Sequence, residues 1–68
     1  MPFVTIKMVE GRGQPQRDTI ARAVTQAIHE QTQIPEKDIW VVVEDVKASD
    51  WYTGATTIAD QRAAARKG

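Results

Sequence analysis

The first residues of the chain carry its clearest chemical possibility. Pro2 follows Met1, and a small second residue usually permits removal of the initiator methionine. Removal would leave a proline with a free secondary amine at the head of the chain. An α-amino group in a model peptide has a pKa of about 7.7–8.0, which apolar surroundings or a nearby cation lower. Pro2 is therefore a candidate for a neutral general base near physiological pH, where such catalysis works best.

Arginines and aromatic residues are the other candidates for chemistry. The single histidine, His29, makes a Ser-His-Asp arrangement or a histidine metal cage unexpected, and the sequence has neither a P-loop nor a GxGxxG motif. An amine that takes a proton, beside an arginine that binds a carboxylate or an enolate oxygen, suits proton transfer next to a carbonyl of an anionic substrate. Many proteins carry a second-position proline without a catalytic role, so the rest of the sequence must decide.

A strand is expected to hold Pro2 at its head. Residues 3–9 are rich in β-branched side chains, with Val4, Ile6 and Met8 on one face. The two glycines within residues 10–13 then indicate a turn or loop that ends the strand.

Residues 14–33 predict a helix with one apolar stripe. Pro15 falls in the first turn, where proline is tolerated, and the residue before Pro35 avoids the helical region, so the helix should end there. His29 falls on the polar face, where we expect it in solvent. The apolar stripe consists of Ile20, Ala23, Val24, Ala27 and Ile28.

A second strand and a small C-terminal unit complete the expected fold. Residues 39–43 are apolar on both sides, as is typical of a buried parallel strand, so strand, helix and strand form a β-α-β unit. Residues 47–50 predict a turn or short helical loop, residues 51–58 a small hairpin or an arm that reaches a neighbour, and residues 60–67 a short helix. The expected class is α+β, with residues 1–68 as a single domain.

Composition limits both the partners and the sources of stability. Below about 70–80 residues one core rarely stabilises a fold alone, and the absence of cysteine excludes disulfides and a cysteine zinc site. Self-association remains, with 41% hydrophobic residues to share between subunits. Nine basic and nine acidic residues cancel, which argues against nucleic acid or a membrane surface as a partner. No signal peptide or membrane span is read from the sequence, so we expect a cytoplasmic protein.

The run PFVTIKMVEGR at residues 2–12 resembles the opening of the 4-oxalocrotonate tautomerase family. The similarity continues through the helix, the IWVVVE strand at residues 39–44 and the aromatic loop to about Arg62. The resemblance implies a β-α-β protomer whose dimers join their sheets and assemble into a homohexamer, a trimer of dimers, with active sites at subunit boundaries. It also implies a terminal proline that moves a proton between carbon atoms of an enol or unsaturated keto acid, without cofactor or metal.

Four residues match positions of that family's site. Pro2 matches the catalytic base. Arg12 matches the arginine that engages the substrate carboxylate, although its spacing alone is typical of a solvated loop arginine. Trp51 matches the aromatic that walls the pocket and helps to keep the proline dry, and it can equally be an interface residue. Arg62 matches an arginine around the site, and its place is also that of a solvated tail residue.

Trp40 is where the sequence departs from the family. The founding member carries a second arginine there, supplied across a subunit boundary to polarise the substrate. An indole has one N–H donor and no charge, so Trp40 can pack against an apolar substrate tail but cannot replace a bidentate cation. We therefore expect a small anionic unsaturated acid with one carboxylate, such as an aryl enolpyruvate or 2-hydroxypentadienoate, in preference to 2-hydroxymuconate.

The resemblance favours an enol–keto tautomerase with Pro2 as general base. Two alternatives stay open. One is hydration or dehalogenation of a small unsaturated acid on the same scaffold, with the proline acting as an acid. The other is a non-catalytic oligomerising subunit, in which the proline is merely the start of the chain.

Overall fold

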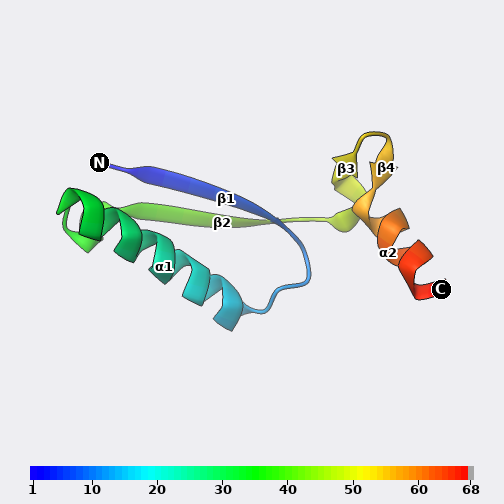
Figure 1. The fold of residues 1–68 in the computed structure, drawn as a ribbon, viewed down its shortest axis with the longest axis horizontal. Helices are drawn as coiled ribbons and strands as arrows, with labels where there is room; N and C mark the ends of the chain where they lie inside the picture. The colour runs from blue at the N-terminus through cyan, green and yellow to red at the C-terminus, as the bar shows by residue number, and fades with distance from the viewer. Residues whose placement is uncertain (68) are drawn as a thin grey trace.

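The computed structural model describes residues 1–67 and has two parts, a β-α-β unit and a C-terminal arm (Figure 1). The β-α-β unit consists of β1 (Phe3–Val9), α1 (Gln14–Thr32), the short 3-10 turn η1 (Glu36–Asp38) and β2 (Trp40–Val46). The arm consists of the 3-10 turn η2 (Ala48–Asp50), β3 (Tyr52–Thr53), β4 (Thr56–Thr57) and α2 (Ile58–Lys67). The expected α+β class and the β-α-β order are confirmed.

The period-two pattern of β1 gives it one inward face. β1 pairs with β2 in parallel, with Phe3 opposite Trp40 at the start of the pairing. The helix α1 lies along one side of this strand pair (Figure 1). Val4, Ile6 and Met8 are half-buried, while alternate positions along the strand are exposed. The predicted inward face of β1 is confirmed.

The other face of the sheet is open, and here the sequence-based expectation is wrong for the single chain. The apolar run at residues 39–43 predicts burial on both sides, yet Trp40 is 55% and Val42 41% exposed. The physical reason is that residues 1–67 contain one long helix, α1, which can cover only one face. Among the described residues only Ile39 and Ala48 are buried, so the chain by itself has a very small core.

The helix α1 begins and ends close to the predicted positions. Gly13 precedes it in an extended conformation, and Pro15 lies in its first turn. At the other end Gln33 adopts the left-handed conformation, with φ 63°, and donates its backbone N–H to the carbonyl of His29 over 2.8 Å. No helix in residues 1–67 is long and apolar enough to cross a membrane.

The apolar stripe predicted for α1 is confirmed in part, because Ile20, Val24 and Ile28 are half-buried. Ala23 and Ala27, which the sequence places on the stripe, are exposed. The sheet selects the face that the helix buries, and exposure of a small side chain such as alanine costs little. His29 is half-buried rather than in solvent, and its Nδ1–H donates to the carbonyl of Ile34 over 2.6 Å. The half-buried positions are Arg17, Asp18, Ile20, Ala21, Val24, Thr25, Ile28 and His29.

The C-terminal arm contains the predicted hairpin and helix. β3 and β4 pair antiparallel around a two-residue loop that starts at Gly54, whose φ of 66° suits a residue without a Cβ. The hydroxyl of Thr57 accepts the backbone N–H of Asp60 over 3.0 Å and so caps the first turn of α2. This cap explains why the helix begins at Ile58, before the predicted start at residue 60.

Candidate active site

Pro2 lies at the head of β1 and is fixed by the neighbouring strand. Its carbonyl accepts the backbone N–H of Trp40 over 3.0 Å, which extends the ladder of β1 and β2 by one bond. Pro2 is half-buried, whereas Met1 before it is 78% exposed. The proline ring is thus held at the edge of the folded unit, while the residue whose removal would free its nitrogen projects into solvent.

Phe3, the residue after Pro2, forms an aromatic pair with Trp40, whose backbone N–H donates to the carbonyl of Pro2. Their ring centroids are 6.5 Å apart and their planes meet at 84°, the edge-to-face arrangement that aromatic quadrupoles favour. Both side chains lie on the open face of the sheet, where Phe3 is 63% exposed. The sequence singles out Trp40 but not Phe3. The strand register, which no local pattern specifies, brings the two rings together.

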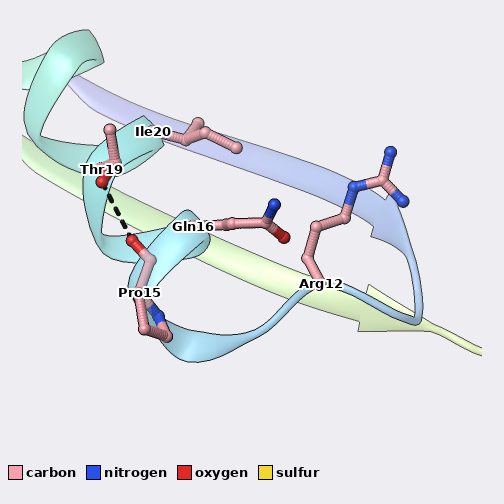
Figure 2. Close-up of a pocket in the computed structure, with 5 residues that line it drawn as sticks. All are labelled: Arg12, Pro15, Gln16, Thr19 and Ile20. Carbon is pink, nitrogen blue, oxygen red and sulfur yellow. Dashed lines mark hydrogen bonds between the residues drawn. The ribbon is translucent and has the colours of Figure 1, made fainter.

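Arg12 lies beyond the opposite end of β1, in the segment that leads into α1. Its side chain is exposed, and within the described part of the chain it makes no hydrogen bond or ion pair. Arg12 borders a surface hollow of about 430 Å³ together with the first turns of α1 (Figure 2). The other lining residues are Pro15, Gln16, Thr19 and Ile20.

The start of α1 adds a favourable field for an anion near Arg12. Gly13 provides no side-chain cap, and the first turn contains no acidic residue. The unpaired backbone N–H groups and the aligned peptide dipoles make a helix N-terminus partially positive. Arg12 and the start of α1 are therefore both positive, and together they favour the binding of a carboxylate.

A neighbouring arginine is already occupied. Arg17 pairs with Asp45 over 2.5 Å and also donates to the side-chain oxygen of Gln14 over 2.7 Å. These contacts hold the first turn of α1 against the C-terminal half of β2. Arg17 serves the fold in this way, whereas Arg12 remains available to a ligand.

Arg62 and Trp51 belong to the arm. The guanidinium of Arg62 donates from Nη1 to the backbone carbonyl of Glu10 over 3.1 Å, so it lies at the same end of the sheet as Arg12. Trp51 is half-buried directly after η2, and its carbonyl accepts the backbone N–H of Ile58 over 2.9 Å. Glu10 was not among the candidates from the sequence. In the sequence it belongs to the run that carries the family resemblance, but its place before Gly11 and Gly13 indicated only the end of a strand.

One chain does not bring the candidate residues together. Pro2 and Trp40 lie at the start of the strand pair, whereas Arg12 and Arg62 lie at its far end (Figure 1). β1 has 7 residues, and at about 3.3 Å per residue of parallel strand its ends are roughly 20 Å apart. Pro2 and Arg12 of the same chain therefore cannot both contact one small substrate.

Comparison with known proteins agrees with this fold. The family model described as tautomerase enzyme matches residues 2–61 of the chain. A probable tautomerase of Bacillus cereus is 38% identical over 61 residues, which cover 90% of this chain and 100% of that protein. The chain therefore belongs to the tautomerase family, as the resemblance of residues 2–12 indicated.

Solved structures of similar chains share the architecture. TomN, a 4-oxalocrotonate tautomerase homologue in the tomaymycin biosynthetic pathway, superposes with a TM-score of 0.86 at 29% identity, over 91% of this chain and 95% of its own. A heterohexamer 4-oxalocrotonate tautomerase from Chloroflexus aurantiacus gives a TM-score of 0.82 at 27% identity, over 88% of this chain and 97% of its own. These similarities confirm the expected β-α-β fold.

Proposed function

We propose that this protein is an enol–keto tautomerase that acts on a small 2-hydroxydienoate or enolpyruvate-type acid, with Pro2 as its general base. The observation that carries the proposal is the family match, which begins at Pro2 itself and continues to residue 61. Its support in the structure is the position of Pro2 at the head of β1, where its carbonyl accepts the N–H of Trp40 and the ring of Trp40 pairs with that of Phe3, the next residue.

The proposed chemistry needs only an amine and a cation. After removal of Met1, the neutral nitrogen of Pro2 takes the hydroxyl proton of the enol, and the carbonyl forms as the electrons shift along the conjugated system. The protonated proline then returns the proton to carbon, which regenerates the free amine. Arg12 binds the carboxylate of the substrate through paired hydrogen bonds and orients it for this transfer.

The aromatic pair supports a substrate with one carboxylate and an apolar tail. A second carboxylate beside Trp40 would lose water without gaining an ion pair, which is costly. An apolar or aromatic tail would instead be buried against the rings of Phe3 and Trp40, at about 25 cal/mol per Å² of apolar surface. We therefore place an aryl enolpyruvate or 2-hydroxypentadienoate ahead of 2-hydroxymuconate, with Trp51 as a further wall of the pocket.

The proposed site needs at least two copies of the chain. The radius of gyration is 15.7 Å, whereas a compact domain of this length has about 11 Å, and an apolar sheet face stays open. β1 and β2 form a two-stranded sheet, so each has an edge free to pair within the described residues. A second copy that joins this sheet antiparallel would bring its Arg12 toward Pro2. We propose a homohexamer, a trimer of dimers, with a dimer or trimer as the simpler alternatives.

A mixing experiment tests the shared site. One variant carries an N-terminal extension that keeps the Pro2 nitrogen in an amide, and the other carries Arg12→Ala. Refolded separately, both should be nearly inactive. Refolded together in equal amounts, they should recover about a quarter of wild-type activity, because random assembly joins an intact proline to an intact arginine in about one site of four. A mixture no more active than its components would contradict a site built from two chains.

Two measurements on the unmodified protein complete the test. Intact mass should show the loss of one methionine, because a retained Met1 leaves the Pro2 nitrogen a tertiary amide that cannot act as a base. Light scattering should show an oligomer at micromolar concentration. Full activity in a preparation that retains Met1 would exclude Pro2 as the base, and a stable folded monomer would exclude the shared site.

A further inference from the structure

Glu10 is the junction between the β-α-β unit and the C-terminal arm. Its backbone N–H donates to the carbonyl of Val46 over 2.8 Å, which joins the ends of β1 and β2. Its side-chain Oε2 accepts the backbone N–H of Ala48 over 3.0 Å, at the start of η2. Its carbonyl accepts Nη1 of Arg62, 52 positions later in the chain and one turn into α2. Three separate segments therefore meet on this one residue.

Gly11, the next residue, lies directly beneath the guanidinium of Arg62. Gly11 has a φ of +127°, a conformation that residues with a Cβ rarely adopt. A Cβ placed there would lie 3.8 and 3.9 Å from the two terminal nitrogens of Arg62. The guanidinium thus covers a turn whose backbone conformation is unusual, and Arg12 follows this turn immediately.

We propose that Arg62 is a positioning residue, which holds the Glu10–Gly11 turn and thereby sets the direction of Arg12. This inference rests on the proposed function, in which Arg12 binds the substrate carboxylate. Arg12 has no hydrogen-bonding partner of its own within the described residues, so its placement depends on the backbone that precedes it. Arg62 is half-buried, and its guanidinium donates a hydrogen bond to the carbonyl of Glu10 in that backbone. It therefore acts through Arg12 rather than as a contact to the substrate.

A double-mutant cycle separates positioning from direct binding. The quantity measured is kcat/KM for an aryl enolpyruvate in the wild type, Arg62→Ala, Arg12→Ala and the double variant. Arg62→Ala should lower kcat/KM about tenfold, mainly through KM, since even a 1 Å misplacement can cost up to about 10²-fold. In the Arg12→Ala background, Arg62→Ala should cause no further loss. Arg66→Ala on the same helix is the matched control and should leave kcat/KM unchanged.

The outcomes distinguish this inference from the proposed function. If the losses of the two single variants multiply in the double variant, Arg62 acts independently of Arg12 and the positioning role is wrong, while the function stands. Unchanged activity in Arg62→Ala leads to the same conclusion. If Arg12→Ala itself keeps full activity, Arg12 does not bind the substrate carboxylate, and both the proposed site and the positioning role of Arg62 are wrong.

A second variant keeps the test decisive if Arg62→Ala fails to assemble. Arg62→Lys retains the charge and a donor but lacks the planar fork, so it should hold the turn less well without removing the contact. It should lower kcat/KM by about two- to fivefold, within the range that small misplacements produce, and only when Arg12 is present. An equal loss with and without Arg12 would overturn the proposal. Circular dichroism and light scattering on each variant confirm fold and assembly.

Discussion

The two ends of the β1–β2 sheet are built from different chemistry. At the Pro2 end, the backbone ladder holds Pro2 at the head of β1, and an edge-to-face pair of aromatic rings lies on the open face of the sheet. At the Arg12 end, hydrogen bonds and an ion pair fix the turns, and an exposed guanidinium stands beside the positive start of a helix. Apolar surroundings favour the neutral form of an amine, whereas a carboxylate is best bound where positive charge is gathered.

Because the two ends are separate, the surroundings of Pro2 and those of Arg12 can differ in polarity and charge. A base that must remain neutral and a cation that must attract an anion make opposite demands on their surroundings. Under the proposed function, the chain would meet both demands because Pro2 and Arg12 lie at opposite ends of one strand pair, roughly 20 Å apart. In the proposed assembly the two ends meet only between copies. The following predictions test this division of roles.

Blocking the nitrogen of Pro2 should have the largest effect. A residue retained before Pro2 makes its nitrogen an amide, and removal of a general base should lower kcat about 10²–10⁴-fold. Pro2→Ala leaves a primary amine and should lose less. Steady-state kinetics with an enolpyruvate measure both, and the same extension placed at the C-terminus serves as the control. If the blocked protein turns over normally, the apolar end of the sheet is not the catalytic end.

Removing the guanidinium of Arg12 should have the next largest effect. Arg12→Ala should lower kcat/KM about 10²–10³-fold, the usual result of deleting a group that stabilises developing charge. Arg22→Ala, an exposed arginine elsewhere on α1, provides a matched loss of charge and should change little. If the two substitutions lower kcat/KM equally, the activity depends on net charge and not on the position of Arg12 at the far end of the sheet.

Placing a cation at the apolar end should alter substrate choice. Trp40→Arg should raise kcat/KM for 2-hydroxymuconate, relative to a monoacid, about 10–100-fold, because a hydrogen bond to a charged group contributes about 1.5–3 kcal/mol. The ratio of kcat/KM values for the two substrates is the measurement, and Trp40→Phe, which stays apolar, is the control. If the wild type already strongly prefers the diacid, another cation serves the second carboxylate and our interpretation of Trp40 is wrong.

A stability change near the Pro2 end should have the smallest effect and leave catalysis alone. Gln33 closes α1 with a φ of 63°, and glycine adopts this conformation without the penalty of a Cβ. Gln33→Gly should therefore stabilise the fold by about 0.5–1 kcal/mol, measured by chemical denaturation at fixed protein concentration. Gln31→Gly, within α1, should destabilise it by about 1 kcal/mol. A loss of stability in Gln33→Gly would mean that the side-chain bond from Gln33 to the carbonyl of Glu30 outweighs the backbone strain.

Local patterns predicted the elements well and their surroundings less well. The alternation of Val4, Ile6 and Met8 identified the inward face of β1, and Pro15 and Pro35 marked the two ends of α1. The same reasoning wrongly predicted that His29 is exposed and that Ala23 and Ala27 lie on the buried stripe. Helical periodicity identified the centre of the buried face, at Ile20, Val24 and Ile28, but not where its edges lie. Burial of β2 on both sides likewise requires a second layer, which residues 1–67 of one chain do not supply.

The sequence by itself determined the class of fold, the family and the identity of the chemical groups. Period-two and helical patterns are local properties, and the run at residues 2–12 carries the family resemblance in one short stretch. The strand expected at residues 3–9 already separates Pro2 from Arg12. Only the tertiary structure paired Phe3 with Trp40 and brought Arg62 onto the carbonyl of Glu10. These are contacts between segments far apart in the chain, and they depend on strand register and on the packing of the arm, which no local spacing encodes.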